Sequence, residues 1–368
     1  MRVTDVVVLV AMLLIILAPS LAGAADTVRF FRIGTAATTG TYFQIGGVLA
    51  SAISKPPGTR DCAHGGSCGV EGLIGVALAT QGSIDNVLAI GSRGLESAFV
   101  QADIAGWAYR GDGLPTPPRC RGAGRDEVQS RGDFLQLLKD RGPISKLRLI
   151  AALFPEDTQI LVRADSGIKG LKDLKGKRIS MGEPGSGTVT DARLVLEASG
   201  LTECDVKPSY LRLSRAAEAL QTGEIDAFFI IAGTPVPAVA ETASLVPLRL
   251  LPIDAVALKR LMGKPPYFHP DTIEGGTYPG IDEPVQTVSV TALWIVSAEV
   301  DDDLVYALAR SLWQDSTRRL LGLTHPAGKR IHIETALAET GVPLHTGAAR
   351  FYAELGMELP PPAPRAPQ

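Results

Sequence analysis

The sequence has little net charge and, after its first 24 residues, no long hydrophobic run. Its 36 Lys and Arg are offset by 39 Asp and Glu, which leaves a net charge of −3 at pH 7. Domains that bind nucleic acid are usually basic, so we expect no nucleic acid partner. A membrane-spanning helix needs about 20 apolar residues, which no later segment offers. We therefore expect the mature chain to be soluble.

The motifs of common enzyme classes are also missing. Gly182–Gly187 has the glycine spacing of a phosphate-binding loop, but Thr188 stands where that loop needs a lysine. No Gly-x-Ser-x-Gly turn precedes a helix with a supporting histidine and aspartate. Asp103 and Asp226 are each interpreted as an N-cap or a strand-end residue rather than as members of a catalytic carboxylate pair. We predict that the protein is not an enzyme and carries no cofactor. The histidines form no cluster in the sequence: His64, His269, His325, His332 and His345.

The first 24 residues have the pattern of a secretory signal peptide. Arg2 precedes an apolar run from Val6 to Ala18, and Ala22-Gly23-Ala24 supplies a cleavage site of small residues. No cysteine follows that site, so the signal is not of the lipoprotein kind. We expect residues 1–24 to be removed and the protein to work in the periplasm. An uncleaved membrane anchor is the alternative.

If the protein is exported to an oxidising compartment, its four cysteines can form disulfides. An even number of cysteines in an exported protein indicates disulfides. Cys62 and Cys68 flank a flexible stretch and are our candidate bridge, while Cys120 and Cys204 either pair or stay free. A zinc site that includes His64 is disfavoured, because the spacing is wrong and no second Cys/His pair lies near it.

Two turns rich in glycine and threonine are the most informative features present. Ile33–Phe43 and Gly182–Thr190 each follow an expected strand and precede an expected helix. A helix N-terminus attracts anions through its unpaired N–H groups, and glycine lets the backbone approach a ligand closely. The two turns are therefore predicted to belong to two lobes that close on one small anion. Alternatively, they are two unrelated helix caps.

Strands and helices alternate along most of the chain, which is typical of doubly wound α/β sheets. We expect strands at 147–153 and 159–163, with a break at residues 156–158. Residues 285–296 have extended, β-branched character, and residues 301–320 are predicted to form one amphipathic helix. Ligands of such sheets bind beyond the carboxyl ends of the strands, which is where the two turns lie.

Two segments fall outside this pattern. Residues 110–142 are rich in Pro, Gly and Arg and are predicted to form a solvated surface insertion, with a basic docking patch as the alternative. Residues 359–368 are a Pro-rich tail that we expect to be disordered.

An ordered set of short motifs resembles the TAXI family, the extracytoplasmic solute-binding proteins of TRAP transporters. Each motif alone is weak, but together they span residues 28–356. The motifs are Ile33-Gly34-Thr35 with Gly40-Thr41-Tyr42; Gly82-Ser83 with Asn86; Phe99 to Asp103; Glu183 to Thr188; Asp226 to Phe229 with Gly233-Thr234-Pro235; Gly276-Thr277-Tyr278; and Pro343 to Ala348 with Phe351-Tyr352.

The resemblance implies a two-lobed periplasmic binding protein fold of type II-like class with a two-segment hinge. The hinge segments would lie near residues 156–159 and 286–290. Lobe one would comprise residues 26–157 plus 287–358, and lobe two residues 158–286. The family captures small carboxylates, such as glutamate and related dicarboxylates, and delivers them to a TRAP membrane permease.

The resemblance also implies a set of ligand-binding residues. Lobe one would contribute the first turn and nearby polar residues, and lobe two the second turn and the segment after a buried strand. The residues are Thr38, Gly40, Thr41, Tyr42, Ser83, Asn86 and Gln101 from lobe one, and Gly185, Ser186, Gly187, Thr188, Gly233 and Thr234 from lobe two.

The first turn departs from the family pattern, because Ala36, Ala37 and Thr39 stand where glycines are common. Their methyl groups either narrow the pocket or replace glycines that never touch ligand, so the departure bears on the ligand rather than on the fold. Two other functions stay open. One is an enzyme on the same scaffold, and the other is a periplasmic sensor that presents its closed form to a membrane receptor.

Overall fold

The computed structural model describes residues 28–111, 120, 137–138, 140–263, 267–338 and 341–361. The expected signal peptide, most of the Arg-rich insertion and most of the Pro-rich tail lie outside the described residues. Within the described part, none of the helices combines the length and hydropathy that a membrane span requires.

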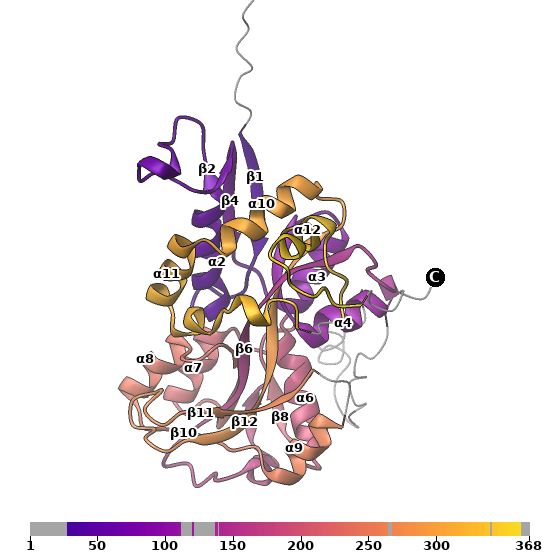
Figure 1. Ribbon diagram of the computed structural model, residues 1–368. Coiled ribbons are helices and arrows are strands. Elements are labelled where there is room, and N and C mark those ends of the chain that lie inside the picture. The colour runs from indigo at the N-terminus through magenta and orange to yellow at the C-terminus, as the bar shows by residue number, and fades with distance from the viewer. Residues whose placement is uncertain are drawn as a thin grey trace, which may run out of the picture.

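The protein is an α/β protein of two lobes joined by one mixed sheet (Figure 1). The order of the main strands is β3-β2-β4-β1-β5-β12-β6-β9-β7-β8, with β10 on β6 and β11 on β12. The fold class is therefore that expected of a periplasmic binding protein. The strands are β1 (Arg29–Gly34), β2 (Ser54–Lys55), β3 (Val70–Glu71), β4 (Leu73–Leu78), β5 (Ser97–Gln101), β6 (Leu147–Arg163), β7 (Arg178–Ser180), β8 (Lys207–Ser209), β9 (Ala227–Ala232), β10 (Leu248–Leu250), β11 (His269–Ile273) and β12 (Val285–Ser297).

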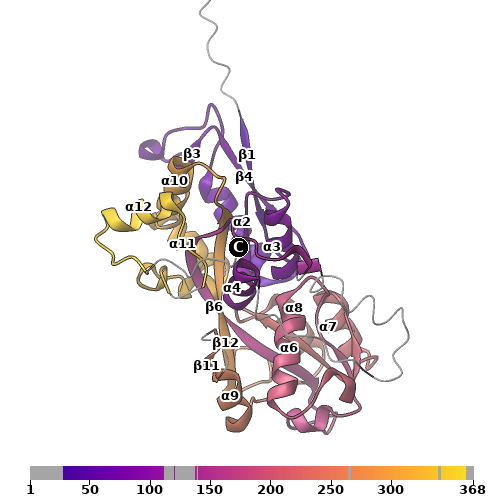
Figure 2. The same ribbon diagram turned by 90° about the vertical axis from the view of Figure 1, so that its right-hand side faces the viewer.

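Two long antiparallel strands, β6 and β12, run through both lobes (Figures 1 and 2). β12 pairs with β5 over Ala292–Val296 in the first lobe and with β11 over Val285–Ser289 in the second. The expected break at residues 156–158 is wrong, because β6 continues from Leu147 to Arg163. Glu156 and Asp157 look like loop residues in the sequence, but both are buried and hydrogen-bonded by side chains from other elements.

Helices cover both faces of the sheet in each lobe (Figure 2). The first lobe carries α2 (Thr41–Ile53), α3 (Ser83–Gly91), α4 (Ala102–Arg110), α10 (Asp302–Leu312), α11 (Asp315–Thr324) and α12 (Thr346–Glu354). The second lobe carries α6 (Gly187–Ala198), α7 (Leu213–Gln221), α8 (Pro237–Leu245) and α9 (Ala255–Met262). Short 3-10 helices are η1 (Cys62–His64), η2 (Leu171–Leu174), η3 (Glu203–Asp205), η4 (Pro326–Arg330) and η5 (Ile333–Thr335).

The single helix predicted for residues 301–320 is two helices, α10 and α11. Helix α10 ends at Leu312, and Gln314 adopts an extended conformation before α11 begins. Tertiary hydrogen bonds support this break. The Trp313 Nε1–H donates to the Tyr352 hydroxyl at 2.9 Å, and the Gln314 amide donates to the Cys68 carbonyl at 3.0 Å.

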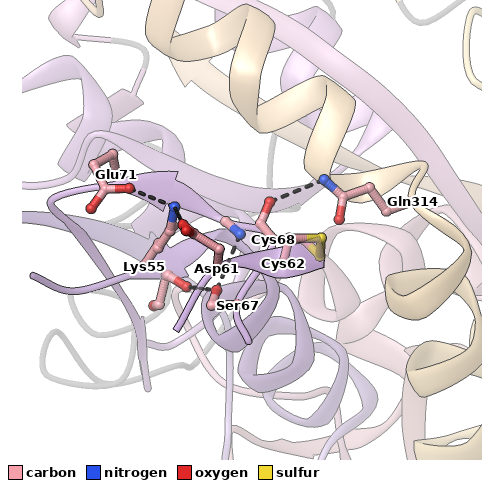
Figure 3. Close-up of a disulfide and its surroundings, with 9 residues drawn as sticks. Lys55, Asp61, Cys62, Ser67, Cys68, Glu71 and Gln314 are labelled. Carbon is pink, nitrogen blue, oxygen red and sulfur yellow. Dashed lines mark hydrogen bonds and ion pairs between the residues drawn. A yellow bond between two sulfur atoms is a disulfide. The ribbon is translucent and has the colours of Figure 1, made fainter. Parts of the chain in front are cut away.

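The predicted bridge between Cys62 and Cys68 is confirmed, and Cys120 pairs with Cys204. Figure 3 shows the first bridge beside Lys55, whose ammonium group contacts Asp61 at 3.2 Å and Glu71 at 2.6 Å. The Gln314 amide reaches the same loop and so connects it to α11. The second bridge joins residues 84 positions apart, and its Cys204 belongs to the second lobe.

Candidate functional site

A cavity lies where the two lobes meet, at the N-termini of α2 and α6. Its wall is built from the turn before α2, the start of α3, the end of β5, the middle of β6, the turn before α6, the start of α7 and the end of β9. The lining residues are Ala36, Ala37, Gly40, Thr41, Tyr42, Gln81, Gly82, Ser83, Gln101, Glu156, Gly182, Glu183, Ser186, Gly187, Thr188, Leu211, Leu213, Ala216, Phe229, Ile230, Ile231 and Ala232.

Both helices begin at the cavity without a side-chain cap. The N-cap of α2 is Gly40, which has no side chain, and the N-cap of α6 is Ser186, whose side chain accepts no hydrogen bond from the first turn. The Ser186 hydroxyl instead donates to the Glu183 carbonyl at 2.7 Å. The first N–H groups of an α-helix have no partner inside the helix. A ligand in the cavity therefore meets two sets of backbone donors, each with about half a positive charge.

Eight of the residues predicted from the sequence line this cavity, five from the first lobe and three from the second. The lobe-one residues lie on α2, α3 and β5, and the lobe-two residues at the start of α6. Their role in binding stays a prediction. They are Gly40, Thr41, Tyr42, Ser83, Gln101, Ser186, Gly187 and Thr188.

The other predicted residues are not part of the lining, and most have structural contacts. The Asn86 amide donates to the Thr35 and Phe99 carbonyls at 2.8 Å each, which holds α3 on the sheet. The Gly185 carbonyl accepts the N–H groups of Ile84 and Asp85 and thereby caps α3 from the other lobe.

Gly233 and Thr234 also connect segments of the chain instead of lining the cavity. The Gly233 carbonyl accepts from the Thr41 hydroxyl at 2.6 Å, which joins the two lobes. The Thr234 hydroxyl donates to Asp157 Oδ2 at 2.6 Å. Thr38 lies in the turn before α2 and does not reach the cavity wall.

Tyr42 is held rigidly at the floor of the cavity. Its ring meets Phe99 edge to face, with centroids 5.5 Å apart, and Phe154 in the same manner at 6.3 Å. Its hydroxyl donates to Glu156 Oε2 at 2.6 Å. Burial, together with the charge of Glu156, raises the pKa of Tyr42 well above its usual value, so its hydroxyl stays protonated.

Glu156 lines the cavity and was missed in the sequence. Its side chain is buried, and this burial raises its pKa well above the ordinary value, although the Tyr42 hydroxyl opposes the shift. A protonated carboxyl group can donate a hydrogen bond to a ligand oxygen. The signal available was a polar pair, Glu156-Asp157, between two strongly apolar segments. We interpreted that pair as a break between strands.

A buried carboxyl pair, Asp103 and Asp191, lies close behind the cavity wall. Gln101, which lines the cavity, donates to Asp191 Oδ2 at 2.9 Å. The interpretation of Asp103 as an N-cap is wrong, because Gln101 occupies that position and Asp103 lies in the first turn of α4. Asp226 is a strand-end residue as expected and pairs with Arg178 at 2.6 Å.

Cationic side chains are absent from the cavity wall, since none of its lining residues is Lys, Arg or His. Glu183 is balanced from outside by Arg212 at 3.3 Å. Among the described residues, no group of three or more His, Cys, Asp and Glu could hold a metal ion. Any anion bound here would therefore depend on backbone N–H groups, hydroxyls and protonated carboxyl groups.

Comparison with known proteins identifies a family and a curated relative that matches part of the chain. The model of the NMT1-like family matches residues 33–117 and 128–356. The putative aliphatic sulfonates-binding protein of Escherichia coli K12 is 29% identical over 154 residues. That alignment covers 41% of this chain and 46% of the relative, so the chain matches about half the length of that curated protein.

Two solved structures cover most of the chain at low similarity. One is the alkanesulfonate-binding protein SsuA from Xanthomonas axonopodis pv. citri bound to MOPS, with 17% identity, a TM-score of 0.45 and coverage of 92% and 86% of the two chains. The other is PhnD1 from Prochlorococcus marinus MIT 9301 with methylphosphonate, with 12% identity, a TM-score of 0.47 and coverage of 89% and 98%. With such low identities and TM-scores, neither structure indicates which ligand this chain binds.

These comparisons correct the family suggested by the short motifs. The assignment to the TAXI family of TRAP transporters is wrong, because the matching model is that of the NMT1-like family and the curated relative is a sulfonates-binding protein. Short Gly/Thr turns at helix N-termini recur wherever an α/β protein needs an uncapped helix end, so they indicate the fold better than the family.

Proposed function

The chain belongs to the NMT1-like family, and we propose that it is an extracytoplasmic solute-binding protein that captures a small organic anion between its lobes. The relative from Escherichia coli is a binding protein by name, which supports binding rather than catalysis. With the secretory pattern of residues 1–24, the proposal places the mature protein in the periplasm and a membrane transporter downstream of it. The comparisons remove the reason for choosing a TRAP permease.

One observation carries the proposal: the uncapped N-termini of α2 and α6 face the same cavity from opposite lobes. Each helix end contributes about 0.3–2 kcal/mol toward an anion. Micromolar affinity requires about 8 kcal/mol, so the hydroxyl of Thr188, which in this structure only accepts from the Ile231 N–H, and the closure of the lobes would have to add to it. The ligand is an acid whose oxygen-rich head group spans both helix ends.

Two head groups fit this chemistry, a sulfonate and a carboxylate. The curated relative favours an aliphatic sulfonate, whereas carboxylates were expected from the motifs. Both are oxyanions that accept several hydrogen bonds, and the cavity wall offers them the same donors. The lobe boundaries at 26–157 plus 287–358 and at 158–286 belong to this proposal, with the hinge in β6 and β12.

The first test is thermal unfolding of residues 25–368 against a panel of small solutes. Ethanesulfonate and butanesulfonate form one arm, succinate, glutamate and 2-oxoglutarate a second, and neutral sugars a third. A ligand at a hundredfold excess over its dissociation constant stabilises the folded state by about 2.7 kcal/mol. A shift in the first or second arm alone supports the proposal and selects the head group. A shift with neutral sugars only would refute it.

The second test removes hydroxyls at the start of α6. We expect Ser186→Ala combined with Thr188→Ala to weaken binding of the selected anion at least tenfold while the protein stays folded. A matched control in the same lobe is Thr222→Ala combined with Ser244→Ala, two exposed hydroxyls that bond only within their own helices. Unchanged affinity in the first variant would exclude this turn from the site.

A further inference from the structure

Two buried aspartates from different lobes lie against each other beside the cavity. Asp103 lies in the first turn of α4, which belongs to the first lobe, and Asp191 lies on α6 in the second lobe. Both residues are fully buried. Figure 2 shows α4 at the base of the upper lobe and α6 in the lobe below it. Their carboxyl groups therefore meet only when the two lobes are together.

The pair has too few hydrogen-bond donors for two ionised carboxylates. Among the described residues, no donor forms a hydrogen bond of good geometry with either oxygen of Asp103 or with the Oδ1 of Asp191, and the N–H groups of Asp103 and Ile104 are near the Asp103 carboxyl group without forming one. Asp191 Oδ2 accepts from the Gln101 amide at 2.9 Å. An ionised carboxylate only accepts hydrogen bonds, so two facing carboxyl groups can bond each other only when one of them holds a proton.

The surrounding groups make ionisation of the pair still less favourable. Glu156 on β6 adds repulsion toward Asp191 only when it is ionised, and the Tyr42 hydroxyl on α2 is bonded to Glu156 rather than to the pair. The N–H groups of Asp103 and Ile104 oppose this and lower the pKa of Asp103, but burial outweighs them and raises it to about 6. Burial and the neighbouring Asp103 also raise the pKa of Asp191 well above its usual value.

Basic side chains do not offset this acidity. Arg193 is on the same helix as Asp191, but its guanidinium bonds Glu203 at 2.9 Å inside the second lobe. Gln101 is a neutral residue between the pair and the cavity. Its side-chain amide donates to Asp191 Oδ2, and its backbone N–H donates to the Ser83 hydroxyl at 3.1 Å. A proton is therefore the cation that this interface can take up.

We propose that closing the two lobes takes up a proton, which is then shared between Asp103 and Asp191, so that the closed form is favoured in acid and lost as the pH rises. The proposal rests on the two-lobed binding function above, because it needs lobes that separate. It makes capture of the solute sensitive to the pH of the compartment. A high pH would favour opening and release.

The direction follows from proton linkage. When the lobes separate, both carboxyl groups face water and regain an ordinary pKa of about 3.9. Between that value and their raised values in the closed form, the closed form binds more protons than the open form. The ratio of closed to open molecules therefore falls as the pH rises, by up to about tenfold per pH unit for one proton.

Small-angle X-ray scattering of the ligand-free chain, residues 25–368, tests this directly. We expect the radius of gyration to increase between about pH 5 and about pH 8 in the wild-type protein, since the like charges that form in this range separate the lobes. The double variant Asp103→Asn with Asp191→Asn should stay compact across the range, because two amides bond each other without a proton.

Asp315→Asn is the matched control, because Asp315 also lies in the first turn of a helix but is exposed, and its ion pair is with Arg318 of the same helix. It should respond to pH as the wild type does. If the double variant does not fold, Asp103→Asn alone should show a weaker response than the control. A constant wild-type radius, or a double variant that expands like the control, would overturn the proposal.

The experiment uses no ligand, so it is independent of the solute panel. A wild-type protein that expands with pH but binds no anion would leave the proton uptake standing and remove the proposed function. A protein that binds an anion but shows no change of radius with pH would support the proposed function and refute the proton uptake.

Discussion

At the scale of single residues, the buried charges of this protein are of two kinds. Arg193 and Glu203 are 3% and 2% exposed and bond each other through Nε and Oε2 at 2.9 Å, and the Tyr210 hydroxyl also donates to Glu203. Asp103 and Asp191, by contrast, face each other without a cation. The Arg193–Glu203 pair lies entirely within the second lobe. The Asp103–Asp191 pair depends on a shared proton and on contact between the two lobes.

Arg193→Ala tests the first kind. The substitution leaves Glu203 buried without its cation, and breaking a buried pair in this way costs about 3–5 kcal/mol. We expect the urea midpoint of unfolding to fall accordingly. Arg215→Ala is the control, because Arg215 is exposed and its ion pairs with Glu218 and Glu224 lie at the surface, where such pairs contribute about 0–1 kcal/mol. Equal losses in the two variants would contradict this account.

At the scale of elements, side chains cap the starts of α9, α10 and α12, whereas α2 and α6 are among the helices that begin without such a cap. Asp254 caps α9 by accepting the N–H groups of Val256 and Ala257, and Asp301 caps α10 through the N–H of Leu304. Helices α2 and α6 begin at the cavity with no such cap. Uncapped N–H groups cost stability when they are buried without a partner. A ligand that accepts hydrogen bonds would supply the missing partner.

Asp254→Ala measures what a cap contributes in this protein. Loss of two accepted hydrogen bonds at the start of α9 should lower the free energy of unfolding by about 1 kcal/mol. Asp254→Asn keeps an accepting oxygen and should cost much less. Urea unfolding of both variants makes the comparison. An asparagine variant as unstable as the alanine variant would mean that charge, rather than the hydrogen bonds, stabilises the helix start.

At the scale of the whole molecule, the lobes contact each other directly around the cavity. The Thr41 hydroxyl bonds the Gly233 carbonyl, and the N–H groups of Ile84 and Asp85 bond the Gly185 carbonyl. Gly187 approaches Gln101 so closely that a Cβ at this position would lie 1.3 Å from Gln101 Oε1. The structure is therefore a closed arrangement whose fit depends on a glycine at the first residue of α6.

Gly187→Ala should disturb this closed arrangement. Gln101 is 2% exposed and holds Asp191, so it would have to give up that bond to make room for a methyl group. We expect a larger radius of gyration than that of the wild type at about pH 5, where closure is favoured. Gly47→Ala in α2 is the control, since a Cβ there meets nothing within 4 Å. The same radius in both variants would show that Gln101 adapts without opening the lobes.

Local sequence patterns predicted the elements near the site because the relevant physics is local. Glycine spacing, an apolar strand and a helical run lie within about ten residues of each other, so the turns before α2 and α6 could be identified from the chain alone. The alternation of strands and helices likewise indicated the α/β class. The Cys62–Cys68 bridge was predicted from a short flexible loop in a chain that we expected to be exported, and it is present.

Contacts between distant residues were decided only by the tertiary structure. Glu156 and Asp157 continue β6 because Tyr42 and Thr234, 114 and 77 positions away, satisfy their carboxyl groups. The helix expected over residues 301–320 breaks because the Gln314 amide meets the Cys68 carbonyl from 246 positions away. Asp103 and Asp191 face each other only because the lobes bring α4 and α6 together. The sequence determines which ionisable groups the chain has. The burial and the hydrogen-bond partners that set the charge of those groups are determined only by the tertiary structure.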